Sequence, residues 1–436
     1  MQGTALAILG LLMIVVFMAL IMAKKLSAFT SLIIVPIIFG LIAGGGLEVF
    51  SYAMGGIKGV ASTFAMMTFA ILYFGIMLNA GMFDPLVTKV VKLVKGDPMK
   101  VLVGTAILAA FVSLDGDGTT TVMICCSALI PIYNKLNIKK IYLATIIILQ
   151  NCIMNLIPWG GPTARVMATM KLDAGEIFTP LIPGMLLSAI YVVGVSYYLG
   201  MKERKRLGIV EFDTSTLSAN SNLSDDEKSW RRPKLIWFNL ALTAVIVFAL
   251  IKGLASSAIL FGVGTAVALV ANFPKQKVQR KVIESIAPDA MNVILMVLGA
   301  GTLMGVLDGS GMSVAIADLL VSIIPASLSR YFAVIIALIS APGTYFLNND
   351  AFYFGILPAL AETAATYGFT PLQIGFASLM GQAFHFLSPL VAFIYLLMEL
   401  TDITLAEYQG YIFRWTIGIF VIFMASGLLL GYLPIL

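Results

Sequence analysis

Charged residues are scarce in this sequence. Asp, Glu, Lys and Arg make up 11% of its 436 residues and hydrophobic residues make up 60%, with a mean hydropathy of +1.00. A soluble domain contains about 25% charged residues. The composition therefore excludes an ordinary soluble protein. It predicts an all-α, multi-pass protein of the cytoplasmic membrane, because helices satisfy their own backbone hydrogen bonds in lipid.

Cysteine and histidine are scarcer still. The three cysteines, Cys125, Cys126 and Cys152, lie in apolar segments and provide neither a disulfide framework nor a zinc-binding spacing. The one histidine, His385, cannot supply a histidine metal cluster, and the chain has no P-loop and no His-Glu-x-x-His motif. We therefore expect a protein that is not an enzyme and that holds no permanently bound cofactor.

Apolar runs recur along the whole chain. A helix needs about 20 residues to cross the bilayer core. Runs that approach this length occupy residues 4–23, 27–43, 60–80, 141–157, 178–199, 235–251, 254–272, 286–306, 371–398 and 411–433. Two pairs of runs are shorter, 101–114 with 119–133 and 331–346 with 352–366. We expect each pair to form a re-entrant hairpin, since about 15 residues reach only about 22 Å.

The order of these segments repeats, which predicts two halves of about five membrane-spanning helices, one hairpin and one broken helix each. The first repeat is expected at residues 1–200, with its hairpin at about 101–133 and its broken helix at about 141–170. A cytoplasmic linker is expected at 201–234. The second repeat is expected at 235–436, with its hairpin at about 331–366 and its broken helix at about 371–398.

The basic residues predict the orientation of the chain. Of the 27 Lys and Arg residues, all but five fall in segments 24–25, 84–100, 135–140, 201–234, 275–281 and 399–414. Such segments face the cytoplasm, so the net charge of +5 reflects topology and not a nucleic-acid partner. Each half has an odd number of spans, so the halves are expected to be inverted. An inverted repeat with broken helices is typical of secondary transporters.

Polar residues interrupt both hairpins at their tips. The first tip reads Ser-Leu-Asp-Gly-Asp-Gly-Thr-Thr-Thr over residues 113–121, and the second reads Asn-Asn-Asp over 348–350. Ionisable groups within a membrane are costly and usually functional. We predict substrate-binding roles for Asp117, Gly118, Thr119, Thr120, Asn348, Asn349 and Asp350.

Asp117 and Asp350 allow two interpretations. Asp is a favourable helix N-cap, so capping alone would explain both. Alternatively, their carboxylates take up a proton or contact a metal cation, while the neighbouring helix N-termini favour an anion. We predict proton-coupling and metal-contacting roles for both. Asp115 is more ambiguous, and Arg165 is a candidate partner for it.

Prolines and glycines break the helix that follows each hairpin. The first break contains Pro-Trp-Gly-Gly-Pro at 158–162, where backbone amides and carbonyls are free to face a cavity. The residues predicted to contact substrate at the two breaks are Asn155, Gly160, Gly161, Thr163, Arg165 and Ser388.

Two ionisable residues lie at these breaks. Arg165 should have a partner, because inserting it at the bilayer centre costs about 2.5–3.5 kcal/mol. A substrate carboxylate is one candidate, and a structural ion pair with Asp115 or Asp117, or snorkelling to the interface, is the alternative. His385 is a candidate proton-coupling residue, or else a hydrogen-bonded structural histidine.

The chain resembles the citrate–metal:proton symporter family (CitMHS) of the ion transporter superfamily. The resemblance is carried by residues 69–77, 81–86, 95–98, 113–121 and 155–165, and more loosely by 197–200 and 202–208. The strings Leu-Asp-Gly-Asp-Gly-Thr-Thr-Thr and Pro-Trp-Gly-Gly-Pro-Thr-Ala-Arg are its most specific parts.

This resemblance implies import of citrate complexed with a divalent metal of the magnesium or calcium type, coupled to proton symport. It also implies a scaffold part that includes the first two spans of each half, a mobile transport part that carries the hairpins, and a homodimer formed through the scaffold. The alternatives are a carrier of free di- or tricarboxylates, a cation/proton exchanger of the same superfamily, and a channel.

Overall fold

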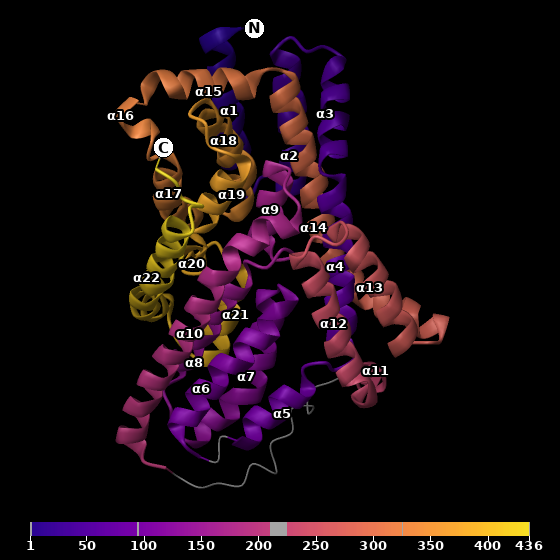
Figure 1. Cartoon of the computed structure of the whole chain (residues 1–436), viewed down its shortest axis with the longest axis vertical. Coiled ribbons are helices and arrows are strands. Elements are labelled where there is room, and N and C mark those ends of the chain that lie inside the picture. The colour runs from indigo at the N-terminus through magenta and orange to yellow at the C-terminus, as the bar shows by residue number, and fades with distance from the viewer. Residues whose placement is uncertain (1, 94–95, 210–224, 325, 436) are drawn as a thin grey trace.

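The structure, a computed structural model, describes residues 2–93, 96–209, 225–324 and 326–435 (Figure 1). The first half contains α1 (Gly3–Met22), α2 (Ala28–Ile42), α3 (Glu48–Gly59), α4 (Ala61–Asn79), α5 (Asp84–Leu93), α6 (Pro98–Val112), the 3-10 turn η1 (Ser113–Asp115), α7 (Gly118–Lys135), α8 (Lys140–Met154), α9 (Gly161–Met170) and α10 (Ala174–Leu207).

The second half is also helical throughout its assigned elements, which confirms the predicted all-α class for the described residues. It contains α11 (Asp225–Trp230), η2 (Pro233–Leu235), α12 (Ile236–Ile251), α13 (Ser257–Asn272), α14 (Gln276–Gly309), α15 (Met312–Ile323), α16 (Ala326–Ser329), α17 (Phe332–Phe346), the π-helical η3 (Ala351–Ile356), α18 (Leu357–Thr366), α19 (Pro371–Leu379), α20 (Gln382–His385), α21 (Ala392–Thr401) and α22 (Leu405–Leu429).

Polar caps set where several of these apolar helices begin. The Ser27 hydroxyl accepts a hydrogen bond from the Thr30 amide at the start of α2. The Asp97 carboxylate accepts one from the Met99 amide at the start of α6, where proline occupies the first turn. Such side chains satisfy amides that have no partner within the helix.

Seven helices are long and apolar enough to cross a membrane, counted over the described ranges. They are α1, α4, α6 with η1, α10, η2 with α12, the 290–309 part of α14, and α22. The helices α2, α8 and α13 are also apolar but shorter, because α2 and α8 end before their apolar runs do and α13 begins three residues into its run. Full-length helices alone therefore do not supply the roughly five membrane-spanning helices predicted for each half.

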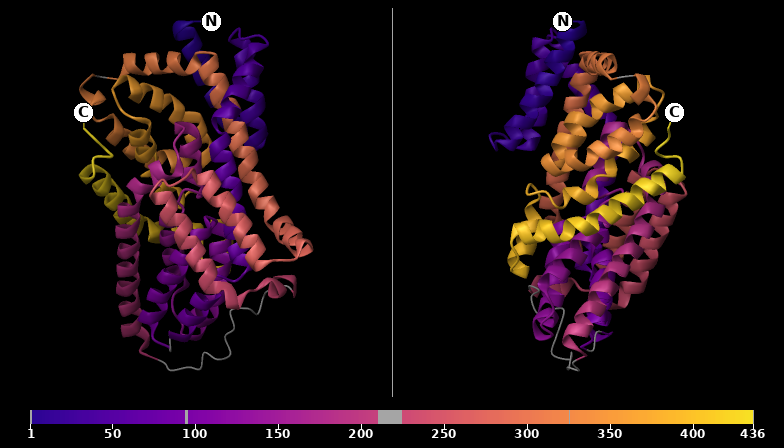
Figure 2. Two further views of the ribbon diagram at one scale, coloured as in Figure 1. Left: turned by 45° about the vertical axis from the view of Figure 1, so that its right-hand side comes forward. Right: turned by 90° about the vertical axis from the view of Figure 1, so that its left-hand side faces the viewer.

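The helices form two groups that pack against each other. In one group, α14 packs along α2, α3 and α4, and α13 packs on α4. In the other, α10 packs on α6, α8 and α22. Figure 1 shows α12, α13 and α14 on one side of the molecule and α6, α8, α10 and α22 on the other. In the right-hand view of Figure 2, α22 crosses the molecule obliquely.

Helix α3 was not expected from the sequence, which predicted a span beginning only at residue 60. It is held by close packing on α14. A Cβ atom on Gly56 would lie 1.9 Å from the Gly301 carbonyl oxygen, and one on Gly305 would lie 2.2 Å from the Tyr52 carbonyl oxygen. Small residues at such crossings allow membrane helices to approach closely.

Helix α10 continues to Leu207, beyond the expected repeat boundary at residue 200. Its last turns are stabilised by an ion pair between Arg206 and the buried Glu203 and by one of 3.5 Å between Arg204 and Asp97. Basic side chains in a last turn also complement the helix dipole. Of the predicted linker, residues 210–224 lie outside the described residues.

Two pairs of helices occupy opposite ends of the molecule. Helices α6 and α7 pack on each other and lie in the lower part of Figure 1, whereas α17 and α18 lie in the upper part. The arms of the first pair extend beyond the expected limits, from Pro98 and to Lys135. This placement is what an inverted repeat would produce, and the repeat and its boundaries stay predictions.

Candidate functional site

The first tip is a tight turn built by its own carboxylates. Gly116 turns the chain with a φ of +82°. The Asp115 carboxylate accepts a hydrogen bond from the Asp117 amide at 2.9 Å. The Asp117 carboxylate accepts bonds from the Thr120 amide and hydroxyl, both at 2.7 Å. Asp117 is therefore the N-cap of α7, as one of its two interpretations predicted, and it remains exposed.

The neighbouring tip residues have different surroundings. A Cβ atom on Gly118 would lie 2.4 Å from the ring of Phe393 in α21, so glycine is needed for this contact. Thr119 is exposed. The hydroxyl of Thr121 donates to the Asp117 carbonyl at 2.9 Å. The first turn of α7 is therefore fixed on one side by packing and open on the other.

The break between α8 and α9 is an ordered turn. The Gly161 amide donates to the Asn155 side-chain oxygen at 3.3 Å, and the Thr163 hydroxyl donates to the Leu156 carbonyl at 2.9 Å. A Cβ atom on Gly160 would lie only 2.0 Å from the Asn155 carbonyl oxygen. Asn155, Gly160 and Thr163 therefore shape the turn.

Trp159 connects this break to the first tip and to the other helix group. Its indole nitrogen donates to the Leu114 carbonyl at 2.9 Å. Its ring stacks on Phe74 of α4 at 4.6 Å and meets Phe261 of α13 edge-on at 5.1 Å. Trp159 lies in the predicted break, but the sequence predicted no role for it.

A cavity of about 670 Å³ opens beside this tip. Of the predicted site residues, Asp117, Thr120 and Gly161 line it, together with Asp115, Gly116 and Trp159. Its remaining lining comes from Met67, Ile71, Phe74, Gly75, Leu78, Asn79, Trp230, Ser285, Ile286, Asn292 and Val293. The charged members of this described lining are Asp115 and Asp117. The cavity is therefore acidic at the tip.

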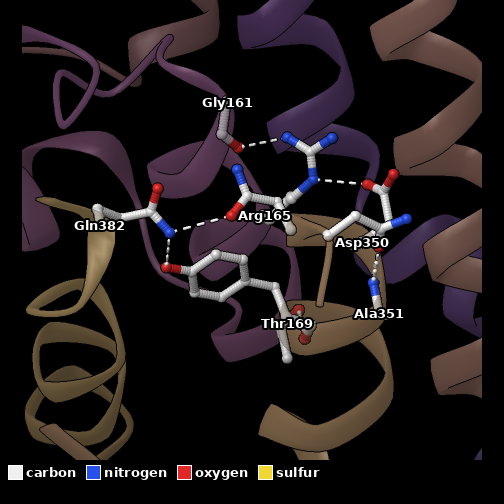
Figure 3. A network of polar contacts seen from close by, with 9 residues as sticks. Gly161, Arg165, Thr169, Asp350, Ala351 and Gln382 are labelled. Carbon is white, nitrogen blue, oxygen red and sulfur yellow. Dashed lines mark hydrogen bonds and ion pairs between the residues drawn. The ribbon is translucent and has the colours of Figure 1, made fainter. Parts of the chain in front are cut away.

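Arg165 connects the break to the second tip (Figure 3). Its Nε donates to the Asp350 carboxylate at 2.7 Å, and one of its terminal nitrogens donates to the Gly161 carbonyl at 2.8 Å. The two side chains of the ion pair are 21% and 14% exposed. The prediction that Arg165 needs a partner is right, but Asp350 is that partner and not Asp115 or Asp117.

The geometry of this pair follows from the turn. Arg165 lies one helical turn after Gly161, so its side chain folds back over the Gly161 carbonyl while its Nε faces the other hairpin. The Asp115 carboxylate instead accepts the Asp117 amide within the first tip.

At the second tip, the capping residue is Asn348 and not Asp350. The Asn348 side-chain oxygen accepts a hydrogen bond from the Ala351 amide at 2.8 Å. Asp350 makes no side-chain capping bond to η3. The alternative that Asp350 is only a cap is therefore wrong, because its carboxylate is directed to Arg165 instead.

Behind the second tip lies a polar network that the sequence did not predict. The Gln382 side-chain nitrogen donates to the Asn349 side-chain oxygen at 3.0 Å and to the Tyr353 hydroxyl at 2.7 Å. The Tyr353 hydroxyl donates to the Ser378 carbonyl at 3.2 Å, and the Thr169 hydroxyl donates to the Tyr353 carbonyl at 3.1 Å. Polar side chains within apolar helices were the available signal.

His385 and Ser388 lie outside the described lining of the cavity. The His385 Nδ1 is 2.7 Å from the Thr344 carbonyl oxygen, and the ring is 8% exposed. The Ser388 hydroxyl accepts a bond from the Leu390 amide at 3.2 Å. These contacts agree with structural roles. The proton-coupling role of His385 and the substrate-binding role of Ser388 stay predictions.

The predicted residues thus divide into two sets. One set lines the cavity, and Arg165 with Asp350 adjoins it through the shared Gly161. The predicted residues outside the described lining are Gly118, Thr119, Asn155, Gly160, Thr163, Arg165, Asn348, Asn349, Asp350, His385 and Ser388.

Two solved structures share this fold. The Alcanivorax borkumensis YdaH transporter matches with a TM-score of 0.58 and 14% identity, covering 90% of each chain. Neisseria gonorrhoeae MtrF, described as illuminating a class of antimetabolite efflux pumps, matches with a TM-score of 0.57 and 12% identity, covering 88% of this chain and 84% of that one. At these identities the likeness concerns the fold alone.

Sequence relatives are much closer. A Bacillus subtilis (strain 168) citrate transporter is 47% identical over 98% of this chain and 99% of its own length. A Mg(2+)/citrate complex secondary transporter of the same organism is 43% identical over 99% of both chains. The family model CitMHS, citrate transporter, matches residues 2–381. The predicted resemblance is confirmed: the chain belongs to the CitMHS citrate transporter family, whose members are membrane transporters and not enzymes.

Proposed function

We propose that this protein imports citrate complexed with a divalent metal ion, coupled to proton symport, by alternating access across the cytoplasmic membrane. Family membership supports citrate as cargo, and the relative named as a Mg(2+)/citrate complex secondary transporter supports the complexed form. The site adds an independent physical argument for the metal.

The acidic lining of the cavity carries this argument. Asp115 and Asp117 face the space that the cargo would enter. Free citrate is an anion with several carboxylates, and like charges repel strongly where water is excluded. A bound divalent cation lowers the net charge of citrate and offers a hard metal that carboxylate oxygens bind well. The lining therefore favours metal–citrate over free citrate.

The rest of the site suits the anionic side of the complex. The first turn of α7 and the first turn of α9 both reach the cavity, through Thr120 and Gly161. Helix N-termini present amides and a partial positive charge, which favour carboxylates. The Thr120 hydroxyl donates to the Asp117 carboxylate, so it orients that carboxylate. In this assignment the metal lies toward Asp117 and the citrate carboxylates toward the first turn of α9.

Proton coupling follows from the Arg165–Asp350 ion pair. While Asp350 is charged, its carboxylate holds Arg165. A proton on Asp350 removes that charge, and Arg165 then becomes available to a citrate carboxylate, which it can grip with two nitrogens. Proton binding and citrate binding therefore favour each other, which is the requirement for symport.

The position of the cavity supports alternating access. Its lining runs from the first tip to Asn79 and Trp230, which lie toward the basic segments assigned to the cytoplasm. The Arg165–Asp350 pair lies beyond its described lining. We assign this conformation to a cytoplasm-facing state, with the helix group of α14 as scaffold, the hairpins in the mobile part, and a homodimer formed through the scaffold.

Uptake of labelled citrate by the purified protein in proteoliposomes tests this function. Uptake is expected to require Mg²⁺ or Ca²⁺, to stop on chelation, and to rise with an inward proton gradient. Uptake that persists under chelation would instead indicate a free carboxylate carrier. Cation flux without citrate would indicate a cation/proton exchanger. Absence of counterflow between labelled and unlabelled citrate would indicate a channel.

A further inference from the structure

The linker end, residues 229–232, reaches the cargo cavity. The sequence predicted only a flexible connector here. Yet Trp230 is 8% exposed and forms part of the same cavity lining as Asp117. A tryptophan buries a large apolar area, so its burial at the cavity indicates a defined position for this part of the linker.

Arg231 fastens the linker end to helix α4. One of its terminal nitrogens donates to the Leu78 carbonyl at 2.7 Å and to the Asn79 carbonyl at 2.9 Å. Its Nε forms an ion pair of 3.1 Å with Asp84. The last carbonyls of a helix lack partners within the helix and carry partial negative charge. Arg231 therefore satisfies the end of α4 and holds Trp230 beside it.

Arg232 makes a second, separate attachment. Its backbone amide donates to the Ala80 carbonyl at 2.9 Å. Its Nε donates to the Asn272 carbonyl at the end of α13 at 2.7 Å, and its guanidinium lies 5.0 Å from the Phe273 ring centroid. Two helices of the proposed scaffold thus hold the residues on the C-terminal side of Trp230.

Local backbone geometry makes room for this attachment. Gly81 follows the end of α4 with a φ of +80°. A Cβ atom there would lie 2.6 Å from the Asp84 carboxylate and 2.8 Å from the Arg231 Cδ. Only glycine combines this backbone conformation with the close approach of Arg231.

We propose that the linker end is a gate on the cytoplasmic mouth of the cargo cavity, with Trp230 as its cargo-facing side chain. The cavity extends from Asp117 at the tip to Trp230, so cargo that leaves toward the cytoplasm passes the indole ring. The two arginines anchor the gate on the scaffold, so that it stays in place when the hairpins move. The inference rests on the orientation in the proposed function, but not on the identity of the cargo.

Cysteine labelling tests the gate without any transport. Ile71 lines the same cavity about two helical turns before the end of α4 and is half-buried. The native cysteines are 0–2% exposed, which keeps their background labelling low. The chain with Ile71→Cys is treated with a membrane-impermeant thiol reagent in inside-out and in right-side-out vesicles. Denatured protein gives the total of reactive thiols.

Adding Trp230→Ala is expected to raise the labelling rate in inside-out vesicles roughly tenfold, which corresponds to about 1.4 kcal/mol of lost closure free energy. Arg231→Gln leaves the indole in the chain but releases its anchor, so it should raise the rate in the same way. Trp237→Ala is the matched control, because Trp237 is 81% exposed on α12 and should leave the rate unchanged.

Equal labelling rates with and without Trp230→Ala would overturn the gate, and so would an equal rise with Trp237→Ala. If Trp230→Ala does not fold, the Arg231→Gln rate decides in its place. Labelling of Ile71→Cys from the right-side-out vesicles alone would reject the proposed orientation, while the ratio between variants would still decide whether Trp230 closes the mouth.

Discussion

Arg165 holds Asp350 with one nitrogen and the Gly161 carbonyl with another, so a single side chain joins the first break to the second hairpin tip. The planar fork of a guanidinium permits this, whereas a lysine ammonium is a point charge. The identity of this residue, and not its charge alone, is therefore expected to matter for transport.

The first prediction concerns Arg165→Lys. The variant keeps the charge but loses one of two charged hydrogen bonds, each worth about 1.5–3 kcal/mol. Citrate uptake, measured as kcat/KM in proteoliposomes, should fall roughly ten- to hundredfold. Arg280→Lys is the control, because Arg280 is 82% exposed in a surface pair with Glu284 and should transport normally. Full activity of Arg165→Lys would contradict the bridging role.

The second prediction separates the two roles of Asp117. Asparagine is also a good N-cap, whereas alanine costs about 1 kcal/mol. Asp117→Asn should keep the melting temperature of the parent but lose metal–citrate uptake, because it removes the charge that faces the metal. Asp117→Ala should have a lower melting temperature than the parent and should also lose metal–citrate uptake. Metal-dependent uptake by Asp117→Asn at the parent rate would show that capping is the sole role of Asp117.

Among the helices, the break between α8 and α9 depends on one of two adjacent glycines more than on the other. A Cβ atom on Gly160 would meet the Asn155 carbonyl at 2.0 Å, whereas one on Gly161 would meet only the movable end of Arg165 at 3.0 Å. The break is therefore rigid at Gly160 and adaptable at Gly161.

The third prediction follows from this difference. Gly160→Ala should abolish uptake and lower the melting temperature, because the turn must open to remove a backbone clash. Gly161→Ala should retain the fold and lose only part of the uptake. Thermal unfolding of the purified variants, followed by citrate uptake, measures both effects. Similar melting temperatures for the two would count against the rigid turn.

The fourth prediction concerns the crossing of α3 and α14. A Cβ atom on Gly56 would lie 1.9 Å from the Gly301 carbonyl, whereas one on Gly55 has nothing within 4 Å. Gly56→Ala should therefore lower the melting temperature by several degrees, since overpacking costs about 1–3 kcal/mol. Gly55→Ala should not lower it. A destabilised Gly55→Ala with a stable Gly56→Ala would refute this crossing.

At the scale of the whole molecule, α9 and α14 also meet outside the described lining of the cavity. Lys171, at the end of α9, forms an ion pair of 3.7 Å with Asp308 of α14. Both side chains are about half exposed, and exposed ion pairs contribute only about 0–1 kcal/mol. The pair can therefore bias the balance of two conformations without locking either.

The fifth prediction is that Asp308→Asn favours the outward-facing state. It removes an attraction present in the cytoplasm-facing state, so labelling of Ile71→Cys from the cytoplasmic side should fall by less than roughly fivefold. Thermal stability should stay close to that of the parent. Arg280→Gln, which breaks a pair within α14, should leave labelling unchanged. A rise in labelling with Asp308→Asn would contradict the assignment of this conformation to a cytoplasm-facing state.

Local properties of the sequence were enough to predict much of this fold. The length of the apolar runs predicted the all-α membrane fold, and the polar interruptions predicted where several helices end and the chain turns. The capping of α7 by Asp117 was also readable, because a cap and its helix are adjacent in the chain. Long, specific motifs at residues 113–121 and 155–165 identified the family.

Only the tertiary structure decided which of these residues meet. The partner of Arg165 lies 185 residues along the chain, and Trp230 enters the cavity from a segment that reads as a connector. Helix α3 is held by close packing on the glycines of α14. Hydropathy and propensity act over a few helical turns, whereas ion pairs and close helix crossings depend on packing between distant segments, which no local pattern encodes.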